Sequence, residues 1–149
     1  MISKETMQIL SKIKGFPDLS ATITGQNING NAYFYGTKFG VVCVFDIFGL
    51  PSGQFLGLHI HEGDTCDNNG DFASAGEHLN LTDTQHPNHT GDLPCVYTNN
   101  GHTLMAVLID KFTLNDIKNR TIIVHSQPDN FTTQPSGNSG SRIACGVIK

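Results

Sequence analysis

About eight short runs of apolar, often β-branched residues are separated by Gly, Asn and Pro along this chain. Such runs are typical of short β-strands joined by turns. They are SATITG, NAYFYG, GVVCVFDI, QFLGLHIH, LPCVYT, TLMAVLID, RTIIVHS and RIACGVI. About eight strands in a chain of 149 residues predict an all-β fold, an antiparallel barrel or sandwich with a single core.

Two kinds of segment interrupt this pattern. Residues Ile2 to Ile13 have a helical spacing of apolar side chains but look poorly capped, so we expect an N-terminal extension over 1–15 and a β domain over 16–149. Glu62 to Leu93 and Ser126 to Ser141 are long polar loops rich in Gly and Asn. Long loops in compact domains are usually functional or disordered, and the histidines favour function here.

Charge and hydropathy exclude several classes of partner. The net charge of −4 and the scattered Lys and Arg residues give no basic stripe that would follow nucleic-acid phosphates. No apolar run approaches the roughly 20 residues of a membrane span, and Lys residues interrupt the N-terminal stretch where a signal peptide would be apolar. The sequence therefore predicts a cytoplasmic protein that binds neither nucleic acid nor membrane and is not secreted by the usual route.

The pair His59 and His61 lies inside the apolar run LGLHIHE. In a strand, residues two apart point to the same face at roughly 7 Å, so both imidazoles can reach one ion while Leu58 and Ile60 face the other way. The alternative is a strand with a polar face and no metal. The pair alone permits chelation without establishing it.

A second group raises the case for metal. The segment HLNLTDTQHPNHTGD contains His78, His86, His89 and Asp92, a complete tetrahedral ligand set for zinc. The alternative is a His-rich surface loop. His125 ends the run RTIIVH and becomes a ligand only if a partner elsewhere joins it; otherwise it is a half-buried strand residue. We expect the remaining histidine, His102, to be a solvated residue in the turn NNGH.

The four cysteines are too sparse for a scaffold built on disulfides. Composition alone leaves two alternatives open: at most one bridge, or four reduced and packed thiols.

In order along the chain, five stretches resemble the copper/zinc superoxide dismutase family: GLPSGQFLGLHIHE, SAGEHLN, HTGDLP, TIIVHSQPDN and GNSGSRIACGVI. The resemblance covers roughly residues 19–148 and implies an eight-stranded Greek-key barrel or flattened, immunoglobulin-like sandwich with two long functional loops. It implies copper bound by His59, His61, His78 and His125, and zinc bound by His78, His86, His89 and Asp92. His78 would bridge the two ions as an imidazolate.

The resemblance also assigns residues around the ions. Asp129 would accept hydrogen bonds from one ligand of each metal, His59 and His86, and so fix their tautomers. Cys66 and Cys145 match the family's disulfide, which leaves Cys43 and Cys95 unpaired. Arg142 matches the arginine that holds superoxide beside the copper.

The chemistry agrees with this assignment. Four imidazoles suit copper, which cycles between two oxidation states, whereas zinc is redox-silent. The implied activity is superoxide dismutation as an antioxidant enzyme, with Arg142 and His78 as the catalytic residues. One alternative is a copper-delivery or metal-binding module without turnover, but the Cys-x-Cys motif of such modules is missing. The other is a non-catalytic dismutase-like domain, which should have lost ligands.

Several spacings depart from those of the animal enzymes. Cys66 follows His61 after only four residues, and GDLP follows the zinc loop, as in the bacterial branch. The segment from His86 to His89 is shorter than in either branch, and the C-terminus ends four residues after Cys145. A homodimer is the expected assembly, but its interface is the least transferable property.

Overall fold

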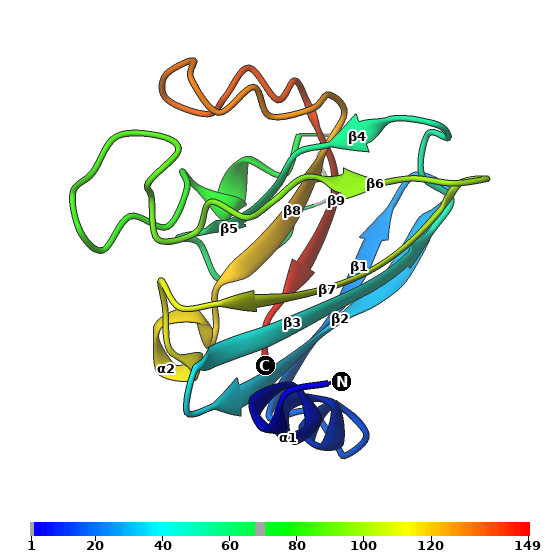
Figure 1. Cartoon of the computed structure of the whole chain (residues 1–149). Helices are drawn as coiled ribbons and strands as arrows, with labels where there is room; N and C mark the ends of the chain where they lie inside the picture. The colour runs from blue at the N-terminus through cyan, green and yellow to red at the C-terminus, as the bar shows by residue number, and fades with distance from the viewer. Residues whose placement is uncertain (1, 68–70) are drawn as a thin grey trace.

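Seven antiparallel strands form one curled sheet in the computed structural model, which describes residues 2–67 and 71–149 (Figure 1). Across the sheet their order is β5 (Leu58–His61), β8 (Thr121–His125), β9 (Arg142–Val147), β1 (Leu19–Gly25), β2 (Ile28–Thr37), β3 (Gly40–Phe48) and β7 (His102–Ile109). Two short strands, β4 (Phe55–Leu56) and β6 (Val96–Tyr97), pair with each other. The predicted all-β class is confirmed.

Alternation along the strands builds the core. In β1 every second side chain is buried, and Leu19, Ala21 and Ile23 join a single apolar cluster with Phe34 and Phe45. Because successive side chains of a strand point to opposite faces, one face of the curled sheet closes on this core. Fully burying each large apolar side chain contributes about 1.5–3 kcal/mol.

The predicted strand over 54–61 is divided at Gly57. Its N–H donates to the Gln127 carbonyl and its carbonyl accepts from the His125 N–H, both at 2.8 Å. A Cβ at this position would lie 2.9 Å from the Cβ of Ser139, so only glycine lets the chains approach so closely. β4 therefore pairs with β6, while β5 pairs with β8 and is tied to the loop that follows β8.

Helix α1 (Lys4–Ile13) occupies the expected N-terminal segment and lies beside β2, far from the two long loops (Figure 1). The expectation of poor capping is wrong, because the Ser3 side chain accepts a hydrogen bond from the Thr6 N–H at 3.1 Å. None of its residues is buried. No helix among the described residues has the length and apolarity needed to cross a membrane.

Two short helical segments lie outside the sequence prediction. The 3₁₀ turn η1 spans Ala73–Ala75, and α2 spans Leu114–Ile117. Helix α2 begins with a capping box, in which Asp116 accepts from the Thr113 main-chain N–H at 2.7 Å. The Thr-x-x-Asp signal was present in the sequence, but a single turn carries too little periodicity to reveal a helix.

A disulfide joins Cys66 to Cys145, 79 residues apart, and ties the loop after β5 to the last strand. In the chain-entropy model, closing a loop of this length destabilises the unfolded chain by about 4.5 kcal/mol. Cys43 and Cys95 are free, as expected. Cys43 lies fully in the core, where burial raises the pKa of its thiol to about 12.

Candidate metal centre

The long loop after β5 returns along the open edge of that strand and places its ligands there. The Ile60 N–H donates to the Gly91 carbonyl at 2.9 Å, and the Ile60 carbonyl accepts from the Leu79 N–H at 2.8 Å. Isolated bridges then pair His59 with Asp92 and His61 with His78. The main chain therefore aligns the loop histidines with the two strand histidines.

The first group of side chains is His59, His61, His78 and His125. One nitrogen of each lies within 4.8 Å of the others, and all four residues are buried. His59 and His61 share one face of β5, as the alternation predicted, while Leu58 and Ile60 belong to the apolar core. His125 enters from the end of β8, where a bulge opens the pairing with β9.

The second group is His78, His86, His89 and Asp92, also buried and within 4.8 Å of one another. Asp92 Oδ1 lies 2.7 Å from His78 Nδ1, and Asp92 Oδ2 lies 3.0 Å from His86 Nδ1 and 3.3 Å from His89 Nδ1. Burial alone would raise the pKa of Asp92, but its hydrogen bond from His78 and the charges of the three imidazoles lower it. The carboxylate therefore stays ionised at the centre of this group.

Asp129 joins the two groups. Its Oδ2 accepts from His59 Nε2 at 2.7 Å, and its Oδ1 accepts from His86 Nε2 at 2.9 Å. Burial would raise the pKa of Asp129, but these hydrogen bonds and one from the Phe131 N–H lower it to about 2. An ionised Asp129 keeps the proton on Nε2 of both His59 and His86. Nδ1 of His59 is then free in the first group, and Nδ1 of His86 is free in the second.

Gly137 makes room for this carboxylate and was not identified from the sequence. A Cβ here would lie 1.9 Å from Asp129 Oδ1 and 2.8 Å from His86 Nε2, and φ is +67°. Both the space and the left-handed backbone require glycine. The run PSGNSG marks a turn, but only the fold shows what approaches it.

Unpaired ring nitrogens test whether these residues suit metal ions. Eight buried side-chain atoms of the described residues have no hydrogen-bond partner, and six are ring nitrogens of the six grouped histidines. They are Nδ1 of His59, His86 and His89, and Nε2 of His61, His78 and His125. Such atoms are costly to bury without a partner, so their convergence fits metal coordination.

The charge state of three of these histidines also fits metal coordination. Burial lowers the pKa of His61 to about 2 and that of His125 to about 3, and it also lowers the pKa of His59. The three imidazoles are therefore neutral near pH 7. Neutral imidazole is the form that coordinates a metal, because the lone pair is free.

Arg142 begins β9 beside the first group. Its Nη1 donates to the Phe72 carbonyl at 2.9 Å and its Nη2 to the Gly76 carbonyl at 2.6 Å. The Gly76 carbonyl also accepts from His61 Nδ1 at 2.9 Å, so one oxygen orients both the guanidinium and a histidine. Phe72 and Gly76 contribute only main-chain oxygens, which no side-chain pattern in the sequence could reveal.

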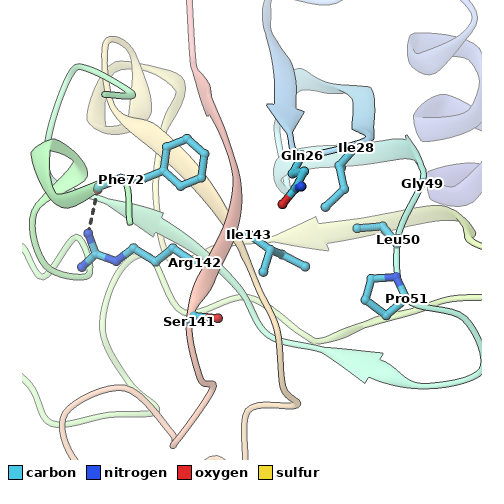
Figure 2. A pocket seen from close by; sticks show the side chains of 9 residues that line it. All are labelled: Gln26, Ile28, Gly49, Leu50, Pro51, Phe72, Ser141, Arg142 and Ile143. Carbon is cyan, nitrogen blue, oxygen red and sulfur yellow. Dashed lines mark hydrogen bonds between the residues drawn. The ribbon is translucent and has the colours of Figure 1, made fainter. Parts of the chain in front are cut away.

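A pocket of about 700 Å³ adjoins this arginine (Figure 2). Figure 2 shows Arg142 and Phe72 on one side and Gln26, Ile28 and Leu50 on the other. None of its lining residues is a histidine, and the grouped histidines are buried under the loops. The candidate metal centre is therefore the two groups of histidines, because none of the residues that line this pocket is a His, Cys, Asp or Glu.

His102 is not the solvated turn residue expected from the sequence. It begins β7, its Nε2 lies 2.7 Å from Asp46 Oδ1, and its ring stacks on Phe48 with centroids 4.1 Å apart. The partners are on β3, more than fifty residues away, so the local turn signal could not indicate them. His102 belongs to neither the first nor the second group of side chains.

Fold and site together define an all-β protein with two adjoining groups of side chains that could hold metal ions and that share His78. The sequence model of copper/zinc superoxide dismutase matches residues 28–148. This chain belongs to the copper/zinc superoxide dismutase family, a family of oxidoreductases, as the five motifs predicted.

Relatives of known name agree. The copper–zinc superoxide dismutase of Legionella pneumophila is 36% identical over 126 residues, covering 80% of this chain and 77% of that protein. That of Escherichia coli K12 is 36% identical over 141 residues, covering 84% and 80%. Among solved structures, the clock protein EA4 has a TM-score of 0.78 at 31% identity, covering 90% of this chain and 95% of that one. A dismutase-like protein from Bacillus subtilis has a TM-score of 0.77 at 28% identity, covering 86% and 96%.

Proposed function

We propose that this chain is a superoxide dismutase that uses one copper ion and one zinc ion per subunit to convert two superoxide radicals and two protons to O2 and H2O2. The observation that carries the proposal is the convergence of six buried, unpaired ring nitrogens on two adjoining points. When bound, copper would supply one-electron redox chemistry, and zinc would supply a fixed positive charge without redox change.

The free nitrogens support a ligand set for each ion. His59 would bind copper through Nδ1, and His61, His78 and His125 would bind it through Nε2. Zinc would be held by the free Nδ1 of His86 and His89, by His78 Nδ1, which lies 2.7 Å from Asp92 Oδ1, and by the carboxylate of Asp92. Asp129 would orient one ring of each set, His59 and His86.

His78 would be the proton-handling residue. Its Nδ1 lies in the second group at Asp92, whereas its Nε2 has no partner and faces the first group. A ring held between two cations gives up its protons more readily than a free imidazole. His78 would therefore hold and release one proton at Nε2, and water would supply the second proton that H2O2 requires.

Arg142 would hold the superoxide anion. Guanidinium is always protonated and has five N–H donors, of which the carbonyls of Phe72 and Gly76 occupy two. The remaining donors can orient an anion and stabilise the charge that develops as peroxide forms. Because the two carbonyls fix the guanidinium, little reorganisation is needed when the anion arrives.

The copper-delivery alternative is not favoured. The cysteines at 43, 66, 95 and 145 form no Cys-x-Cys motif, and two of the four are in the disulfide. The four proposed copper ligands lie within 4.8 Å of one another, and Arg142 shares the Gly76 carbonyl with His61, which supports an enzyme over a delivery module.

Superoxide decay after reconstitution tests the proposal. Protein loaded with copper and zinc should speed the decay of a superoxide pulse in proportion to its copper content, with about one copper per chain. Zinc-only protein should show no catalysis, since zinc is redox-silent. Stoichiometric copper without catalysis would refute the enzyme and favour a binding module.

Two further properties belong to the proposal. We infer a homodimer from the family, which sedimentation of the purified protein would test. The cytoplasm is the compartment expected from the sequence, although disulfides such as Cys66–Cys145 persist mainly in oxidising compartments. Cell fractionation decides between the two.

A further inference from the structure

The free thiol of Cys95 makes both of its hydrogen bonds to one residue, Asp129. The Asp129 N–H donates to Cys95 Sγ at 3.3 Å, and Cys95 Sγ donates to the Asp129 carbonyl at 3.8 Å. The two residues are 34 positions apart in sequence. A thiol is a weak donor and a weak acceptor, so it can satisfy an N–H and a carbonyl together.

The Asp129 main chain has no other partner in the described part of the chain. None of the peptide-to-peptide hydrogen bonds of the loops includes Asp129, which is only 4% exposed. A buried N–H or carbonyl without a partner costs about 1–3 kcal/mol. Cys95 is therefore the group that fixes the main chain of Asp129.

The position of Cys95 links the two metal-binding segments. It lies three residues after Asp92 of the second group, and Asp129 lies four residues after His125 of the first. Asp129 in turn holds His59 and His86, one ring in each group. A shift of its main chain would thus move both carboxylate oxygens away from both rings.

We propose that Cys95 is a positioning residue that fixes the main chain of Asp129 so that one carboxylate orients a histidine of each metal group. This inference rests on the proposed function only in taking the two metals to be copper and zinc. The hydrogen bonds that carry it do not depend on which metals bind. Burial raises the pKa of the Cys95 thiol, so it keeps the proton that it donates to the carbonyl. Cys43, the other free thiol, is buried in the core away from this site and provides a matched control.

The test compares Cys95→Ala, which removes the donor and the acceptor, with Cys95→Ser, which keeps both. In metal-free, 15N-labelled protein, the wild-type chain should show His59 and His86 as single Nε2–H tautomers that exchange slowly with water. Cys95→Ala should speed exchange of both ring protons about tenfold, equivalent to about 1.4 kcal/mol, whereas Cys95→Ser and Cys43→Ala should stay near wild type. Zinc(II) affinity of Cys95→Ala should fall about tenfold.

Unchanged tautomers and exchange in Cys95→Ala would overturn the proposal, as would an equal effect in Cys43→Ala, which would indicate general loosening. If Cys95→Ala does not fold, Cys95→Thr and Cys95→Val give the same comparison, because they share a shape and differ in the hydroxyl. Equal ring-proton exchange in this pair would also contradict the proposal. The ring-proton readout needs no metal and no superoxide, so its result is independent of whether the chain is a dismutase.

Discussion

Replacing His125 by alanine should abolish superoxide dismutation while leaving zinc bound. His125 belongs only to the first group, where its Nε2 is one of the four converging nitrogens. Changing residues that merely orient a ligand typically costs 10–100-fold in affinity or activity, so losing a ligand should cost about 100-fold or more. Superoxide-decay assays and metal analysis of the same His125→Ala sample give the measurement.

His102→Ala is the matched control, since this histidine contacts Asp46 and Phe48 and lies outside both groups. It should keep both metals and full activity. Activity in His125→Ala equal to wild type would refute the assigned copper site. Loss of both metals in that variant would show instead that the two groups do not bind independently.

Acidification from pH 7 to pH 5 should strongly destabilise the metal-free protein. The ordinary histidine pKa is 6.5, whereas burial lowers the pKa of His61 to about 2 and of His125 to about 3. Below pH 6.5 these two histidines therefore bind protons in the unfolded chain but stay neutral in the folded chain. Stability is present above about pH 6.5 and is lost progressively as pH falls toward the folded-state pKa.

Each of these two histidines should lower the free energy of unfolding by about 2 kcal/mol between pH 7 and pH 5, or about 4 kcal/mol together. The lowered pKa of His59 acts in the same direction. Urea unfolding at the two pH values measures this change. In His61→Asn the change in the free energy of unfolding between pH 7 and pH 5 should be smaller by about 2 kcal/mol, because one buried histidine is missing. A stability independent of pH over this range would mean that the imidazoles are not buried in the neutral form.

Much of the sheet could be predicted, because the alternation of buried and exposed residues along a strand can be read from neighbouring positions in the sequence. The runs over 40–47 and 142–148 coincide closely with β3 and β9. The break at Gly57 could not be predicted, because it arises from hydrogen bonds to Gln127 and His125, far away in sequence.

The two groups of side chains could be predicted for a similar reason. His59 and His61 follow the strand period, and the loop histidines are close enough in sequence to form a group. The stretches that resemble the family added His125, Asp129 and Arg142. Two contributions could not be predicted from side-chain patterns. The Gly76 carbonyl acts through the main chain, and Gly137 acts by having no side chain where Asp129 approaches it.

Metal identity at each position is the most direct test of the central claim. Anomalous diffraction at the copper and zinc absorption edges, on crystals of reconstituted protein, locates each element separately. We expect copper beside His59 Nδ1 and Nε2 of His61, His78 and His125, and zinc about 2.0–2.1 Å from Nδ1 of His78, His86 and His89 and beside Asp92. Copper at the second group, or no metal at the first, would contradict the account.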